Sequence, residues 1–204
     1  MSYQDGWATI NLEMPARVPH TEYSVTSHWE VVRRVTGLPV DSSSPAELRD
    51  RASRALVQAW NFDFAWSVLV NAEPFGDLLT DMGHAVYEAD GSDWRDTIHC
   101  PFTDPEQVLN FDFEEAYGAA DIPAWTRRFE EHYRGNCRSN PEMVNMTGIY
   151  TTLISGLIQV FGWDMLLLSA GVDQKRFGAL ADRYAAWIGR YYQALAEADV
   201  PVVM

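Results

Sequence analysis

The last sixty residues of the chain carry the pattern that most limits its fold. Residues 143–204 alternate as an apolar strand, a long helical stretch and a second apolar strand, 200–204, at which the sequence ends. An apolar strand that follows a long helix is typical of the second half of a βαβ unit. In parallel α/β folds, the reactive groups lie just beyond the carboxyl ends of the strands. The pattern therefore predicts a parallel sheet that is cut off before the polar residues expected after this strand.

The length and charge of the chain limit its class. Its 204 residues suffice for one domain with a sizeable core, so we expect a single domain over 1–204 that is incomplete at its C-terminus. With 15 basic and 29 acidic residues, the net charge is −14, which argues against nucleic acids and anionic membranes as partners. Cys100 and Cys137 are too few for a disulfide framework. The start of the chain is unlike a signal peptide, and the longest apolar run, 165–170, is too short to span a bilayer, so we expect a cytoplasmic protein.

Strand and helix signals alternate along the chain. Buried strands are predicted over 62–70, 143–147 and 200–204, and a more exposed one over 84–89. An extended arm is predicted for 1–20. Helices are predicted over 21–36, 45–60, 104–108, 123–134, 150–161, 164–170 and 173–197. The apolar stripe of the last helix has the spacing of core packing. Three buried strands fall short of the eight of a closed (β/α)₈ barrel.

Several short motifs give the chain a family resemblance. In order they are Arg17-Val18-Pro19, Thr36-Gly37, Asp63-Phe64, Gly148-Ile149-Tyr150-Thr151-Thr152-Leu153 with Gly156, and Asp173 before a helix that ends Ala194-Leu195-Ala196-Glu197-Ala198-Asp199. This order resembles the uroporphyrinogen decarboxylase superfamily, which contains haem-pathway decarboxylases and zinc-dependent, corrinoid-linked methyltransferases. The resemblance implies an α/β fold, the N-terminal half of a TIM (β/α)₈ barrel, and porphyrin-related metabolism.

The chain departs from the decarboxylases at two places. Their N-terminal segment supplies arginines that grip substrate carboxylates, whereas residues 19–24 here contain no arginine. Their first strand ends near an aspartate, and Val70 or Asn71 occupies that place in this chain. The resemblance therefore implies a divergent lyase of decarboxylase type that acts on a small or tetrapyrrole-like substrate and is incomplete as an independent catalyst.

A corrinoid-linked methyltransferase is the alternative within the same resemblance. These enzymes bind zinc through a His-x-Cys pair and a later cysteine in their C-terminal half. His99 and Cys100 are direct neighbours in sequence, and Cys137 is distant from both. This spacing does not predict a zinc site. We expect no metal and no cofactor, with zinc and corrinoid implied under the alternative alone.

Polar residues that follow the first predicted strand are the first candidates for catalysis. Asn71 and Glu73 lie at the expected catalytic rim, where Glu73 could act as a general base, or could be a solvated loop carboxylate. Tyr150 occupies the corresponding place after the next strand. We therefore name Glu73, Asn71 and Tyr150 as catalytic candidates.

Four further residues are candidates for binding substrate. Gly148 could permit close approach of a ligand to the backbone, or could form a tight turn whose neighbouring hydroxyls, including that of Thr151, cap the next helix. Glu22 and His28 bracket a helix start that could reach over the barrel mouth, although His28 could equally be an exposed or structural histidine.

A non-catalytic role is the remaining hypothesis. A half barrel has unpaired strand edges and an open apolar interior, and such surfaces associate with other surfaces. This hypothesis predicts a second copy of the chain or a separate C-terminal half as the partner, whereas the enzyme hypotheses predict a small-molecule substrate.

Overall fold

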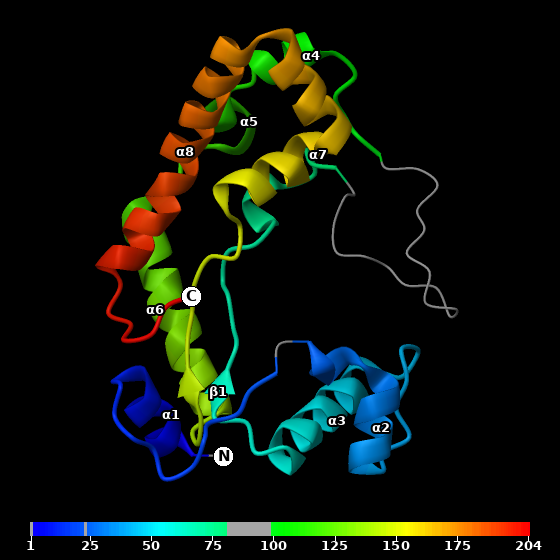
Figure 1. Ribbon diagram of the computed structural model, residues 1–204, viewed down its shortest axis with the longest axis vertical. Coiled ribbons are helices and arrows are strands. Elements are labelled where there is room, and N and C mark those ends of the chain that lie inside the picture. The colour runs from blue at the N-terminus through cyan, green and yellow to red at the C-terminus, as the bar shows by residue number, and fades with distance from the viewer. Residues whose placement is uncertain (1, 23, 81–98) are drawn as a thin grey trace. The chain divides into compact units, whose positions relative to one another are not determined.

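The computed structural model describes residues 2–22, 24–80 and 99–204. In this part of the chain it contains eight α-helices, two short 3-10 helices and two strands of two residues each (Figure 1). The chain divides into two compact units, and each combines stretches that are distant in sequence. The first unit comprises residues 1–67, 131–147 and 200–203. The second comprises residues 68–130, 148–199 and 204.

The predicted α/β fold with half of a TIM barrel is wrong, because the described part of the chain is mostly helical. β1 (Phe64–Ala65) pairs in parallel with β2 (Val144–Asn145), and regular pairing extends no further than these two positions. A barrel requires eight paired strands. Apolar, β-branched runs indicate buried extended chain, but they do not specify how far a hydrogen-bonded ladder extends.

Each of the three predicted buried strands does contain parallel pairing. In the second unit, Val70 forms an isolated parallel bridge with Ile149. In the first unit, Thr147 forms another with Val203. The predicted strand over 84–89 lies outside the described residues. The pattern thus located the extended segments and their direction, whereas the extent of the sheet was overestimated.

The N-terminal arm predicted over 1–20 is wrong for its first half, which forms α1 (Tyr3–Ile10). The helix begins because the Ser2 side chain accepts a hydrogen bond from the Asp5 amide, which satisfies one of the free donors of the first turn. Gly6 lets the helix approach the strands closely, since a Cβ atom there would lie 2.9 Å from a methyl carbon of Val144. The sequence signal that could have located this helix is the serine cap.

A helical hairpin forms the other part of the first unit. It consists of η1 (Val25–Ser27), α2 (Trp29–Thr36) and α3 (Ala46–Ala59). The predicted helix over 45–60 is confirmed, whereas the one predicted over 21–36 begins later, at Trp29, and ends as predicted at Gly37 with a φ of 71°. The core of the hairpin consists of four buried residues, Val32, Val40, Ala52 and Leu56.

Helix α6 (Ile122–Ser139) is longer than the sequence predicted. The predicted end at residue 134, directly before Gly135, is wrong, because the helix continues through this glycine for another turn. A glycine inside a helix costs only about 1 kcal/mol relative to alanine, and the amphipathic pattern of the helix outweighs that cost. Residues up to Glu130 belong to the second unit and later ones to the first.

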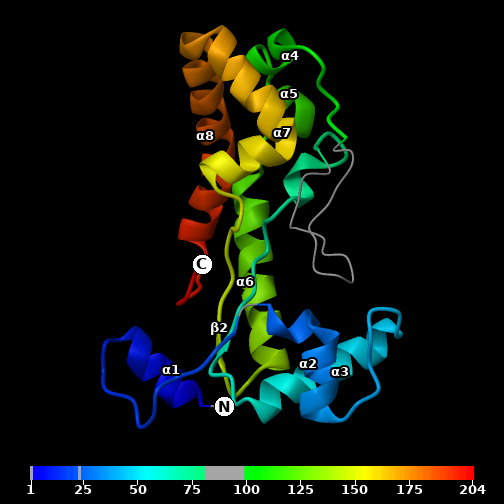
Figure 2. The same ribbon diagram turned by 45° about the vertical axis from the view of Figure 1, so that its right-hand side comes forward.

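The second unit is a group of helices around one long helix. Its elements are η2 (Glu73–Phe75), α4 (Pro105–Leu109), α5 (Phe113–Tyr117), α7 (Leu153–Val172) and α8 (Gln174–Glu197). Figures 1 and 2 show α7 beside α8, with α4 and α5 against them. Asp173 caps α8 by accepting a hydrogen bond from the Arg176 amide, so the helix begins where the sequence predicted.

An aromatic cluster fills the core of the second unit. Trp187 of α8 is its centre, with ring centroids 5.6 Å from Phe75, 6.0 Å from Phe113 and 5.4 Å from Tyr191. Its indole N–H donates to the Gly118 carbonyl at 2.8 Å, so the one polar atom of the ring is satisfied. The apolar stripe predicted for this helix is therefore core packing.

By length and composition alone, α7 could cross a membrane, and it is the one such helix among the described residues. It is not continuous, because Gly162 has a φ of 72° and a ψ of 163° and divides it in two. Each part has at most ten residues and is roughly 15 Å long, about half of a bilayer core.

Candidate functional site

The ends of two parallel segments bring together most of the site residues predicted from the sequence. In the second unit, the Val70 amide donates to the Gly148 carbonyl at 3.1 Å, and the Tyr150 amide donates to the Val70 carbonyl at 2.9 Å. Because the segments run in the same direction, Asn71 and Tyr150 follow them at the same end. We call Asn71, Glu73, Gly148, Tyr150 and Thr151 the strand-end cluster.

Thr151 holds the strand-end cluster together. Its buried hydroxyl donates a short hydrogen bond to the Asn71 carbonyl, and its own carbonyl accepts from the hydroxyl of Tyr192 on α8 at 3.3 Å. The helix cap that the sequence suggested here is formed by the next residue. Thr152 and Ser155 form a reciprocal capping box at the start of α7, in which the Ser155 amide donates to the Thr152 hydroxyl at 3.2 Å.

The chain's own backbone occupies the space beside Gly148. A Cβ atom at this position would lie 2.2 Å from the Met204 carbonyl oxygen, and the Ile149 amide donates to that oxygen at 3.1 Å. The glycine therefore permits close approach, as the sequence suggested, but the partner is the third extended segment. Gly148 thus allows the Met204 backbone to lie beside the strand-end cluster.

The chemistry available to the cluster follows from its residue types. Asn71 offers an amide that can both donate and accept, and Tyr150 offers a phenol. Glu73 begins η2, two residues after Asn71 in the sequence. An amide, a phenol and a carboxyl together can bind a substrate carboxylate and move one proton.

Glu22 and His28 are not part of this cluster. Both belong to the first unit, where His28 precedes α2 and makes no side-chain hydrogen bond to cap it. Glu22 is exposed, and one of its carboxylate oxygens lies 3.6 Å from Nε2 of His20. Between them lies the 3-10 helix η1, and α2 begins only after His28, in the unit that lacks the strand-end cluster.

The first unit contains a pocket of about 580 Å³, which Glu22 lines. Its walls come from α3, from residues 62–66 around β1, and from the turn over 139–143 before β2. Sequence reasoning missed this pocket, because its lining residues come from four separate stretches. The one available signal was the density of aromatic residues from Trp60 to Trp66.

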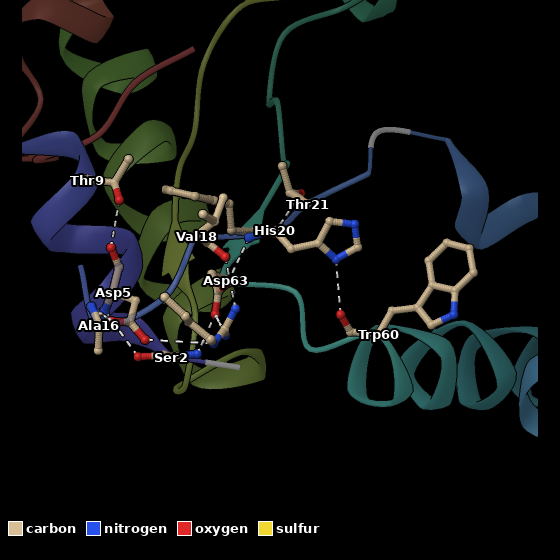
Figure 3. Close-up of polar contacts among 11 residues, drawn as sticks. Ser2, Asp5, Thr9, Ala16, Val18, His20, Thr21, Trp60 and Asp63 are labelled. Atoms are coloured by element: carbon tan, nitrogen blue, oxygen red, sulfur yellow. Dashed lines mark hydrogen bonds and ion pairs between the residues drawn. The ribbon is translucent and has the colours of Figure 1, made fainter. Parts of the chain in front are cut away.

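A buried carboxylate, Asp63, anchors the N-terminal segment to β1 (Figure 3). Its Oδ1 accepts from the Ser2 amide at 2.7 Å and from the Arg17 guanidinium, and its Oδ2 accepts from the His20 amide at 2.8 Å. Asp63 is fully buried, so two backbone amides and one guanidinium replace its lost hydration. Nearby, a hydrogen bond with the Ser2 side chain lowers the pKa of Asp5, and a hydrogen bond from the Ala16 amide is the next largest cause.

A chain of hydrogen bonds connects α6 to the two segments in the first unit. The His132 ring lies with Nε2 3.1 Å from the Ser67 hydroxyl and Nδ1 2.7 Å from the Thr147 hydroxyl. A serine beside a histidine is the pairing that activates nucleophiles. Here the buried Thr147 hydroxyl contacts the other ring nitrogen of His132, where such sites have the group that orients the histidine. The contact also holds α6 against the two extended segments. Sequence reasoning missed this set, since the three residues are far apart in sequence.

Within residues 2–22, 24–80 and 99–204, the side chains of His, Cys, Asp and Glu form no group of three or more that could hold a metal ion. Cys100 and Cys137 are free thiols, and the Cys100 thiol donates to the Phe161 carbonyl at 3.2 Å. The strand-end cluster is thus described by its organic groups alone.

Comparison of the chain with protein-family models, with curated proteins and with solved structures finds no significant match. The site is therefore interpreted from its own geometry.

Proposed function

We propose that the chain is a divergent uroporphyrinogen decarboxylase-like lyase, which removes a carboxyl group as CO₂ from a small or tetrapyrrole-like substrate. The observation that supports this most directly is the parallel bridge between Val70 and Ile149. It brings Asn71 and Tyr150 next to each other at the carboxyl ends of two parallel extended segments. We also place the protein in the cytoplasm, in keeping with two free thiols.

The reaction has a simple balance. The bond between the substrate carbon and its carboxylate breaks, CO₂ leaves, and the electron pair remains on carbon, which then takes one proton. In this proposal Asn71 and Tyr150 bind the carboxylate through hydrogen bonds, and Glu73 delivers the proton as a general acid. Neither binding nor protonation by these groups requires a cofactor.

The test is CO₂ release from uroporphyrinogen under anaerobic conditions, with the products separated by chromatography. We expect Glu73→Gln to reduce the rate by about a hundredfold or more, as for loss of a general acid. Tyr150→Phe should reduce it about tenfold, the effect of one lost hydrogen bond. The matched control is Tyr3→Phe in α1, which should leave the rate unchanged. Absence of CO₂, or equal rates in all variants, would contradict the proposal.

A second candidate function, assembly, is favoured by one specific observation. Six large apolar residues of α7 are between 47% and 62% exposed: Leu153, Ile154, Trp163, Leu167, Leu168 and Val172. Surfaces of this kind are typical of interaction sites. Among the twenty residues of α7, Asp164 is the single ionisable one, whereas the chain as a whole carries a net charge of −14.

The partner that fits this surface is a second copy of the chain. Two acidic copies repel each other least where each presents an uncharged face. Light scattering should give about twice the 23.1 kDa of one chain. Leu167→Glu should shift the protein to the monomer, and Met14→Glu, at an exposed apolar residue of the first unit, should not. A monomer in the unsubstituted protein would contradict the assembly.

A further inference from the structure

The pocket of the first unit has the size of a ligand site. At about 580 Å³ it falls within the range that holds small organic molecules. Every residue that lines it belongs to the first unit, so its shape is set by one compact body. It is independent of the strand-end cluster, whose residues belong to the second unit.

The lining of the pocket includes apolar side chains and one large exposed ring. Phe62 and Met143 are buried, and Val57 belongs to the same lining. Trp66 is 43% exposed, although it is the largest side chain in the lining. A large aromatic ring that is partly exposed in a pocket offers surface on which a ligand can stack.

The polar part of the lining is acidic. It contains three carboxylates, those of Glu22, Asp50 and Glu142, against the single guanidinium of Arg54. Arg54 forms a short ion pair with Asp50, one turn away on α3. Two carboxylates therefore remain without a lysine or arginine partner in the lining. An anionic ligand would be repelled here, and a cationic one attracted.

We infer that this pocket binds an organic cation with an aromatic or apolar body, such as an aryl-alkyl ammonium ion. The apolar body packs on the wall formed by Val57, Phe62 and Met143. The cationic head lies over the indole face of Trp66, which attracts it through the ring quadrupole. Glu22 and Glu142 supply the opposite charge at the rim.

The probe for this inference is benzyltrimethylammonium, titrated into the full chain and measured by calorimetry. Two analogues of similar shape separate charge from packing: neutral benzyl alcohol and anionic benzenesulfonate. We expect saturable binding of the cation, about tenfold weaker binding of the alcohol and no binding of the sulfonate. Raising the salt to 0.5 M should weaken binding of the cation, because rim charges are screened.

Variants then locate the site. Trp66→Ala should weaken binding of the cation by about tenfold, and Glu142→Gln by about threefold. The matched control is Trp163→Ala, since Trp163 is 47% exposed on α7 and does not line the pocket. Far-ultraviolet circular dichroism confirms that each variant is folded. The inference is overturned if the cation does not bind saturably, if the alcohol binds as tightly, or if Trp66→Ala binds as the unsubstituted protein does.

Discussion

At the scale of single residues, Asp63 is the most constrained position in the first unit. It is a fully buried carboxylate, and two backbone amides and one guanidinium donate to it. An unpaired carboxylate at this depth would be strongly destabilising, so the N-terminal segment and β1 depend on each other. Removing either the acid or the cation breaks an arrangement in which each polar atom has a partner.

We expect Asp63→Asn to lower the free energy of unfolding by about 3 kcal/mol, the usual cost of breaking a buried pair. The amide group of asparagine cannot accept at both oxygen positions, so one of the Ser2 and His20 amides loses its partner. The measurement is a urea titration followed by circular dichroism. Asp182→Asn, on the exposed side of α8, is the control and should change stability by less than about 0.5 kcal/mol. Equal effects of the two substitutions would refute the structural role of Asp63.

The sequence predicted individual residues well where local chemistry decides their role. Gly148 was predicted either to let a ligand approach the backbone or to form a tight turn, and it is the backbone of Met204 that lies beside it. Asp63 was recognised as the start of a strand, but its partners could not be predicted. Ser2, Arg17 and His20 come to it from 43 to 61 residues away, and no periodic signal connects such positions.

At the scale of elements, the contact between α7 and α8 depends on one glycine. A Cβ atom at Gly156 would lie 1.7 Å from the Tyr184 hydroxyl oxygen and 2.9 Å from a methyl carbon of Thr151. Tyr184 is buried, and this burial raises the pKa of its phenol. The ring therefore has little room to move away.

Gly156→Ala should lower the melting temperature, because overpacking costs about 1–3 kcal/mol and outweighs the gain in helix propensity. Gly178→Ala is the matched control, since this glycine also lies in a helix but has no atom within 4 Å of the added Cβ. That variant should gain up to about 1 kcal/mol. If Gly156→Ala were as stable as Gly178→Ala, the close packing of α7 on α8 would be wrong.

A bidentate ion pair connects α4 to α8 and gives the second unit a pH dependence. The Arg176 guanidinium donates to both carboxylate oxygens of Glu106 at 2.8 Å, and this hydrogen bonding lowers the pKa of Glu106 below its ordinary 4.5. A carboxyl whose pKa is lower in the folded state contributes stability above its unfolded pKa. That contribution is lost as the pH falls through the lowered value.

We therefore expect the difference in stability between the unsubstituted chain and Glu106→Gln to be present at pH 7 and to disappear as the pH falls below 4.5. Thermal unfolding at a series of pH values measures it, with Glu142→Gln as a control at an exposed glutamate. A difference that stayed constant from pH 7 to pH 3 would show that the pair does not contribute.

The positions of most helices were predicted better than the residues at which the helices begin and end. The helices over 45–60 and 173–197 were located closely, because each combines a clear start signal with an apolar stripe. α1 was missed because Pro15 and the lack of periodicity around it suggested an irregular arm. The end of α6 was misplaced because Gly135 resembles a stop signal, although it is an ordinary helical residue here.

At the scale of the whole molecule, the sequence predicted the direction of the extended segments and not the architecture. Parallel pairing occurs in each of the three, at Phe64 with Val144, Val70 with Ile149, and Thr147 with Val203. The number and length of strands in a sheet depend on contacts across the whole chain, which local patterns do not contain. The helices therefore dominate a chain that was expected to be α/β.

The central claim is that the pairing of Val70 with Ile149 places Asn71 and Tyr150 where substrate binds. Nuclear magnetic resonance of the ¹⁵N-labelled chain tests it directly, by titration with uroporphyrinogen under anaerobic conditions. We expect saturable shifts of the side-chain amide of Asn71 and of the backbone amides of Tyr150 and Thr151, and loss of these shifts in Asn71→Leu. Signals of these three residues that stay unchanged at saturating uroporphyrinogen would contradict the claim.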